Sequence, residues 1–163
     1  MKRSKIVILL SGGVDSALVA ALCSEALGID NVLCISMPET ESPRSSIDDA
    51  KLIAKTFSLK LEIINISSPV EAFRSLLSPS GVALANIKAR CRMVVLYAIA
   101  NKHNYLVAGT GNKSELLLGY FTKYGDGGTD ILPIGDIYKT HVWDMAKGMG
   151  IPDRIINKRP SAE

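Results

Sequence analysis

The sequence predicts an α/β fold: a doubly wound, mostly parallel sheet with helices on both faces. Two observations predict it. Short, β-branched apolar runs alternate with longer helical patterns, and the first run has the uninterrupted apolar character of a buried parallel strand. Strands that alternate with helices imply right-handed crossover connections. Ligands of such sheets bind beyond the carboxyl ends of the strands, so the loops that follow the strands are expected to carry the site.

The first elements have recognisable boundaries. The run "KIVILL" (5–10) is expected to be a buried strand, and the helix expected over 14–27 ends at Gly28. A second strand, "NVLCISM" (31–37), ends at Pro38. These two strands therefore flank the first helix in a crossover unit.

The second helix is expected over 46–57, introduced by Ser45 or Ser46. Asp48 and Asp49 are then expected in its first turn, where they would favourably meet the helix dipole. The later elements are expected, in order, as a strand at 59–66, a short helix at 69–77, a helix at 84–103, a strand at 105–109, and helical patterns at 140–149 and 152–157.

Length and composition limit the function classes. At 163 residues the chain fits one domain with a substantial core, and 47% hydrophobic with 21% charged residues is typical of a globular protein. The net charge of +3 is too small to indicate a nucleic-acid binder but suits an anionic ligand. The three cysteines lack metal-type spacing and are predicted to be reduced, buried thiols of a cytoplasmic protein (Cys23, Cys34 and Cys91). No run is long enough to cross a bilayer, so no membrane partner is expected.

The loop "SGGVDS" (11–16) follows the first strand. Glycines between a strand and a helix let backbone N–H groups converge on an anion, and the helix N-terminus adds a positive dipole. Ser11 and Ser16 could donate hydroxyl hydrogen bonds to the same phosphates. Asp15 would oppose an anion unless a divalent cation lay between them, so the loop predicts a polyphosphate site whose Mg²⁺ is held by Asp15. The alternative is a plain glycine turn in which Asp15 and Ser16 cap the helix.

The spacing excludes two familiar phosphate loops, the Walker loop and the dinucleotide fingerprint. Instead, "SGGVDS" resembles the pyrophosphate (PP) loop of the ATP pyrophosphatases, which cleave ATP between its α and β phosphates. Five further segments look like ammonia-dependent NAD synthetase in order and spacing: "NIKARCRM" (86–93), "GTGNKSE" (109–115), "GYFTKYGDGGTD" (119–130), "LPIGDIYKTHVWDMA" (132–146) and "INKRPSAE" (156–163). The resemblance implies a Rossmann-like fold of the adenine nucleotide α hydrolase type.

The resemblance also implies a reaction. In that family ATP adenylates the carboxylate of nicotinic acid adenine dinucleotide (deamido-NAD) and pyrophosphate is released. Ammonia then displaces AMP to give NAD. The family implies Mg²⁺ as cofactor, ATP as co-substrate and a homodimeric enzyme. No acid, base or nucleophile is assigned in this sequence, so catalysis is expected to rest on positioning and charge stabilisation.

Site residues carry over from the family's motifs. The resemblance assigns ATP contacts to Ser11, Gly12, Gly13, Val14, Asp15, Ser16, Met37, Thr110, Lys139 and Ser161. It assigns deamido-NAD contacts to Arg90, Lys123 and Asp130, and the metal to Asp15 and Glu115. Without the resemblance, Lys139 would be a surface lysine, Glu115 a solvated helix residue and Met37 a core side chain.

The sequence also departs from the family's pattern. Leu9 stands where the family usually has glycine, two residues before the loop serine. A single domain is expected over 1–163, without the helical segment that precedes the family's first strand and without the tail that follows "PSAE". Two alternatives stay open: a truncated, non-catalytic remnant that binds ATP, and another PP-loop enzyme such as a tRNA-modifying enzyme, for which Cys91 is the candidate cysteine.

Overall fold

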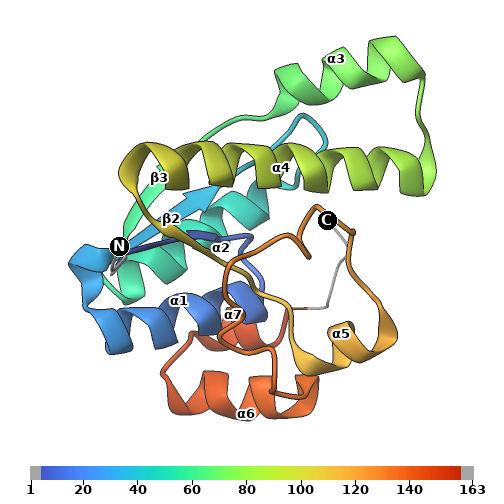
Figure 1. Cartoon of the computed structure of the whole chain (residues 1–163). Coiled ribbons are helices and arrows are strands. Elements are labelled where there is room, and N and C mark those ends of the chain that lie inside the picture. Colours follow the sequence, from blue (N-terminus) through green and yellow to red (C-terminus); the bar gives the residue numbers. More distant parts are fainter. Residues whose placement is uncertain (1–4, 159–163) are drawn as a thin grey trace.

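A computed structural model describes residues 5–158, and a parallel sheet of four strands lies at its centre (Figure 1). The strand order is β3–β2–β1–β4. The strands are β1 (Ile6–Leu9), β2 (Val32–Ser36), β3 (Lys60–Ile63) and β4 (Leu106–Ala108). Because the chain moves outward from β1 to β3 and then returns to place β4 on the other side of β1, the strand order reverses between β1 and β4. A crevice for ligands is expected at that reversal, beyond the carboxyl ends of these two strands.

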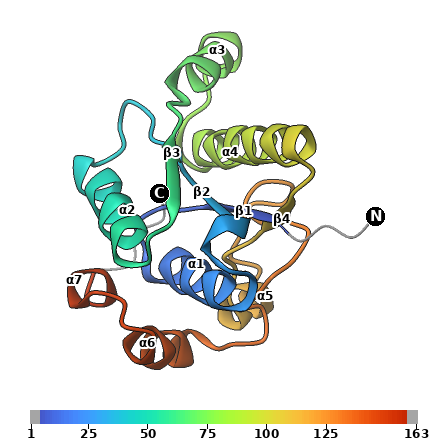
Figure 2. The same ribbon diagram turned by 90° about the vertical axis from the view of Figure 1, so that its left-hand side faces the viewer.

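Helices cover both faces of the sheet (Figure 2). Their bounds are α1 (Val14–Leu27), α2 (Arg44–Thr56), α3 (Ser67–Leu77), α4 (Gly81–His103), α5 (Lys113–Leu118), α6 (Lys139–Gly148) and α7 (Asp153–Ile156), with a short 3₁₀ turn at Ile29–Asn31. The first two helices lie on one face, with α6 and α7 outside them, and α3 and α4 lie on the other (Figure 2). The predicted doubly wound α/β architecture is therefore confirmed.

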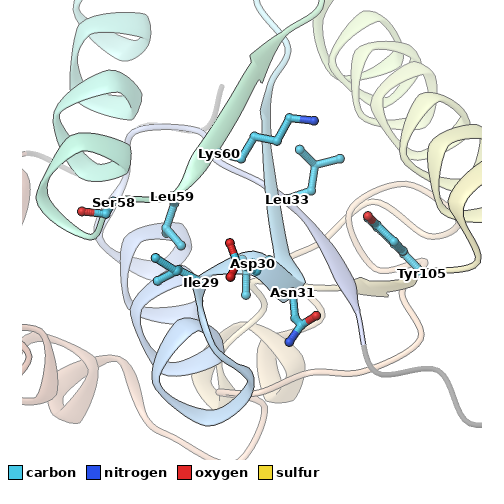
Figure 3. A pocket seen from close by; sticks show the side chains of 9 residues that line it. Ile29, Asp30, Asn31, Leu33, Ser58, Leu59, Lys60 and Tyr105 are labelled. Atoms are coloured by element: carbon cyan, nitrogen blue, oxygen red, sulfur yellow. The ribbon is translucent and has the colours of Figure 1, made fainter.

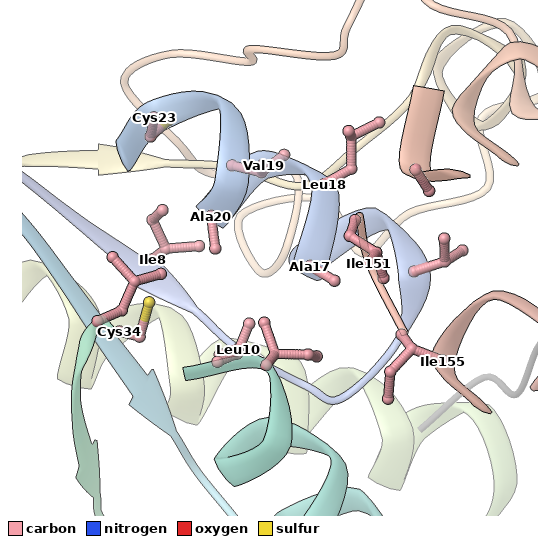
Figure 4. Close-up of a cluster of buried hydrophobic side chains, with 14 of the residues drawn as sticks. Ile8, Leu10, Ala17, Leu18, Val19, Ala20, Cys23, Cys34, Ile151 and Ile155 are labelled. Atoms are coloured by element: carbon pink, nitrogen blue, oxygen red, sulfur yellow. The ribbon is translucent and has the colours of Figure 1, made fainter. Parts of the chain in front are cut away.

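The core has two halves because successive strand residues point to opposite faces of the sheet. On one side Ile8 is fully buried with Leu18 of α1 and Ile155 of α7 (Figure 4). On the other side Val7 is fully buried in a cluster with Val107. Each fully buried side chain of this size contributes about 1.5–3 kcal/mol through removal from water.

The first helix, α1, is buried almost all round. It packs on the sheet with one side and on α6 and α7 with the other. A helix enclosed in this way needs no polar face, which explains why its sequence is apolar throughout its middle. It ends at Gly28, as predicted, because this glycine adopts a φ of 85° that other residues rarely take.

The start of α2 differs from the prediction. The helix begins at Arg44, directly after Pro43, and no side chain caps it, so the expected cap by Ser45 or Ser46 is wrong. A backbone turn closed by Ser42 N, which donates to Glu39 O at 3.0 Å, precedes Pro43, and the fixed φ of Pro43 (−60°) leads the chain into the helix. No acidic residue occupies its first turn, so the expected placement of Asp48 and Asp49 there is also wrong.

Two further expectations concern the whole chain. Among residues 5–158, no helix has both the length and the apolarity to cross a membrane. The three cysteines are buried and free of disulfide bonds, as predicted. Burial raises the pKa of Cys23 to about 11 and that of Cys34 to about 12, which keeps both thiols protonated near neutral pH.

Candidate functional site

The loop at residues 11–16 leaves the carboxyl end of β1 and leads into α1. Gly12 is buried and adopts a φ of 83°. A Cβ atom at this position would lie 2.6 Å from the carbonyl oxygen of Ser46 and 3.0 Å from the Cβ atom of Asp49. Glycine is therefore required here twice, for its conformation and for the close approach of the loop to α2.

The hydroxyl groups of the loop hold its shape. The Oγ atoms of Ser11 and Ser16 lie 3.1 Å apart, and Ser16 Oγ donates to the carbonyl oxygen of Gly13 at 2.9 Å. Gly13 is the N-cap residue of α1 and has no side chain to cap the helix, and Gly13 N donates to Ser11 Oγ at 3.3 Å. The expected cap by Asp15 and Ser16 is wrong, because the Asp15 carboxylate contacts Asn112 and Lys139 and Ser16 Oγ donates to Gly13 O.

The carboxylate of Asp15 has two partners from distant segments. Asn112 Nδ2, which lies beyond the end of β4, donates to Asp15 Oδ1 at 3.0 Å. The ammonium of Lys139, the first residue of α6, pairs with Asp15 Oδ2. Lys139 Nζ also lies 5.6 Å from the centre of the Trp143 ring. These contacts tie three segments together at the reversal in strand order.

The second predicted metal ligand, Glu115, lies in the first turn of α5. The side chain of Asn112 accepts from Glu115 N at 3.0 Å, and Glu115 Oε2 accepts from Asn112 N at 3.1 Å, which is a capping box. Asn112 is fully buried, and because it donates to both Asp15 and Glu115 it links the two carboxylates. The role of Asn112 was not predicted from the sequence, although the "NKSE" spacing is a capping-box signal.

The charges of the site fit a small hard cation. Asn112 donates to both carboxylates, from its backbone N to Glu115 and from Nδ2 to Asp15. Burial raises the pKa of the Glu115 carboxyl, and the charge of Asp15 acts in the same direction. Within residues 5–158, no group of three or more His, Cys, Asp and Glu could hold a metal ion alone. Two carboxylates suit Mg²⁺, which keeps several waters and completes its shell with substrate phosphates.

Comparison with known proteins identifies the family. The family model described as NAD synthase matches residues 1–163. The chain belongs to the NAD synthase family. It is 52% identical over 160 residues to the NH(3)-dependent NAD(+) synthetase of Methanococcoides burtonii, covering 96% of this chain and 61% of that protein. The corresponding protein of Archaeoglobus fulgidus is 52% identical over 159 residues, with 96% and 64% covered.

Solved structures support the same assignment. NMN synthetase from Francisella tularensis superposes with a TM-score of 0.91 at 36% identity, covering 98% of this chain and 67% of that one. NH3-dependent NAD synthetase from Campylobacter jejuni, in complex with the nitrate ion, gives 0.90 at 40% identity, with 96% and 68% covered. The chain thus has the NAD synthase fold, and it spans 61% to 64% of the length of the two curated relatives described above.

Two further ATP contacts that the NAD synthase resemblance implies lie at the same edge of the sheet. Thr110 follows β4 and is partly buried. Met37 follows β2, and its side chain is buried in the core, as its alternative interpretation stated. Its carbonyl oxygen accepts from Arg92 Nε at 3.3 Å, so Arg92 also reaches this edge, which the sequence analysis did not predict. Ser161 lies outside the described residues.

The residues that the family resemblance assigns to deamido-NAD are not all brought together. Arg90 of α4 donates from Nε and an Nη atom to the carbonyl oxygen of Lys123, at 3.3 and 3.2 Å. Asp130 has a structural task, because its Oδ2 accepts from Val107 N at 2.8 Å and its Oδ1 accepts from Tyr97 Oη at 3.1 Å. It therefore covers the open edge of β4, and its contact with substrate stays a prediction.

A cavity of about 380 Å³ lies elsewhere on this NAD synthase chain (Figure 3). It is lined by residues at the amino ends of the strands, among them Asp30, Lys60 and Tyr105. None of the predicted site residues lines it. The cavity is therefore separate from the site, which lies at the opposite edge of the sheet.

Proposed function

We propose that the chain carries the ATP-using site of an ammonia-dependent NAD synthetase, a ligase that amidates deamido-NAD to NAD and releases AMP and pyrophosphate. One observation carries the proposal. Asp15, Glu115 and Lys139 come from three distant segments and converge at the carboxyl ends of β1 and β4: the buried Asn112 links the two carboxylates, and Lys139 pairs with Asp15. Parallel α/β sheets bind nucleotides at this position.

Each residue has a chemical task in this function. The glycine loop and the N-terminus of α1 bind phosphate oxygens through N–H groups, with Ser11 and Ser16 as hydroxyl donors. Asp15 and Glu115 hold Mg²⁺, which when bound would neutralise phosphate charge. Lys139 pairs with Asp15. Its flexible side chain can turn its ammonium to the pyrophosphate leaving group as negative charge develops there.

The chemistry requires little acid–base help. The substrate carboxylate attacks the α phosphorus of ATP, the α–β phosphoanhydride bond breaks and pyrophosphate leaves. Ammonia then attacks the activated carbonyl carbon, loses a proton to solvent and expels AMP. The chain's contribution is to position the reactants and stabilise charge. Thr110, Met37 and Ser161 are proposed as further ATP contacts.

The proposal extends to the acyl substrate and the assembly. Arg90 and Lys123 supply cationic donors for the diphosphate of deamido-NAD, and Asp130 is proposed as a third contact. A cytoplasmic homodimer is part of the proposal. A mononucleotide is a second candidate substrate, favoured by the similarity to the NMN synthetase of Francisella tularensis.

The experiment supplies the chain with ATP, Mg²⁺ and ammonia, together with either deamido-NAD or nicotinic acid mononucleotide. NAD with AMP and pyrophosphate supports the proposal, whereas amidation of the mononucleotide alone favours the second candidate. Nucleotide binding without AMP formation would identify a non-catalytic ATP-binding remnant. Release of ADP and phosphate would reject the assigned bond cleavage. Asp15→Asn is the inactive comparison, and Glu62→Gln, at an exposed ion pair on β3, is the matched control.

A further inference from the structure

A buried carboxylate outside the site described above has two cationic partners. The side chain of Asp49, on α2, is only 3% exposed. Its Oδ1 atom lies 2.8 Å from Arg154 Nε, and its Oδ2 atom lies 3.1 Å from Lys158 Nζ. Arg154 belongs to α7 and Lys158 follows it, so these ion pairs fasten α7 and the residues directly after it to α2. A buried carboxylate without such partners would be strongly destabilising.

The turn of α2 that contains Asp49 also supports the loop at residues 11–16, called the phosphate loop below. A Cβ atom at Gly12 would lie 2.6 Å from Ser46 O and 3.0 Å from Asp49 Cβ, so the loop backbone touches this turn directly. From the other direction, Lys158 Nζ lies 3.4 Å from Ser46 Oγ. The phosphate loop and the segment that carries Arg154 and Lys158 therefore contact the same turn of α2, and Asp49 lies between them.

The charges of this cluster do not cancel. One carboxylate faces two cations, so the cluster of Asp49, Arg154 and Lys158 carries an excess positive charge. The Arg154 side chain is 60% exposed and is screened by solvent, whereas that of Lys158 is 24% exposed. Lys158 is thus the cation whose charge acts more strongly on an anion in the neighbouring loop.

We propose that Asp49 is a positioning residue for nucleotide binding. It holds Lys158 against the turn of α2 that contacts Gly12, and this turn keeps Gly12 in its positive-φ conformation. The ammonium of Lys158 then lies on the side of this turn away from the phosphate loop and supplies a fixed positive charge. Asp49 touches no phosphate itself. The inference deepens the proposed function and rests on it, because the anion concerned is the triphosphate of ATP.

The test measures nucleotide affinity rather than turnover. Asp49→Asn removes the buried charge and leaves two cations that can reach water, so it leaves no buried charge unpaired. Calorimetry with Mg²⁺ and adenosine 5′-(α,β-methylene)triphosphate, which cannot be cleaved between the α and β phosphates, is expected to show about tenfold weaker binding. Glu62→Gln is the matched control and is expected to bind like the unsubstituted chain.

A double-variant cycle separates positioning from general loosening. Lys158→Met leaves Asp49 paired with Arg154 and is expected to weaken binding by a similar factor. In that background Asp49→Asn should add little, because the residue acts through Lys158. Unchanged affinity of Asp49→Asn, or losses that multiply in the double variant, would overturn the inference alone. Absence of binding by the unsubstituted chain would overturn the proposed function and the inference with it.

Discussion

The two edges of the sheet differ in how their polar groups are used. At the carboxyl edge, Asn112 and Lys139 come from separate segments and both contact the carboxylate of Asp15. At the amino edge, the cavity of about 380 Å³ has polar walls, but Lys60 pairs with Glu62 on its own strand. In this molecule the candidate site is therefore distinguished by oppositely charged side chains that converge from distant segments, and not by the presence of a cavity.

The largest effect is expected at the carboxyl edge, from Lys139→Met. The variant removes the ammonium that pairs with Asp15 and is proposed to stabilise the pyrophosphate leaving group. We expect kcat/KM for ATP to fall by about 10²–10³-fold, as for the loss of other preorganised groups that stabilise transition-state charge. The measurement is the initial rate of AMP formation at saturating Mg²⁺. An unchanged rate would make Lys139 a surface lysine and remove the contrast between the edges.

Gly12→Ala tests whether the carboxyl edge depends on the close approach of the phosphate-loop backbone to α2. The new Cβ atom would meet Ser46 O at 2.6 Å in a conformation that L-residues rarely adopt. We expect a loss of about 2–4 kcal/mol in the free energy of unfolding, measured by urea denaturation. Gly81→Ala is the matched control, because Gly81 also has a positive φ, of 51°, but nothing lies within 4 Å of its Cβ position. Equal losses in the two variants would show that the contact with α2 is unimportant.

The fold could be predicted to a large extent because its signals are local. The apolar run of β1 and the glycine at Gly28 fix their elements without help from the rest of the chain. The start of α2 could not be predicted, because the turn before Pro43 directs the chain and competes with the capping preference of Ser45 and Ser46. Tertiary context overrides such weak local preferences.

The site was predictable only in part, for the same physical reason. The motifs mark Asp15, Lys139 and Glu115, but Asp15 and Glu115 are linked by Asn112, whose bond to Asp15 depends on two loops meeting across the sheet. The task of Asp130 at the edge of β4 likewise follows from the fold and not from its neighbours in sequence. Sequence patterns identify which residues carry charge, whereas their partners are set by long-range contacts.

A smaller effect is expected from pH and Glu115. Burial, followed by the charge of Asp15, raises the pKa of this carboxyl in the folded chain. The folded state therefore holds a proton that the unfolded state releases, so stability without ligand should fall as pH rises from about 4.5 through the raised pKa. Glu115→Gln keeps a side chain suited to the capping box but cannot ionise. Thermal unfolding across this window should show a weaker decline for the variant, and parallel curves would contradict the assignment.

The smallest effect is expected at the amino edge, where a loss of activity would directly contradict the difference proposed between the two edges. Lys60→Met removes a lining residue of the cavity together with its ion pair to Glu62. The side chain of Lys60 is 71% exposed and that of Glu62 is 43% exposed. Exposed pairs contribute little, so we expect the free energy of unfolding to change by less than about 1 kcal/mol. AMP formation should be unchanged, because the cavity shares no lining residue with the proposed site. A marked loss of turnover with unchanged stability would mean that the amino edge takes part in the reaction, and that converging charges alone do not mark the site.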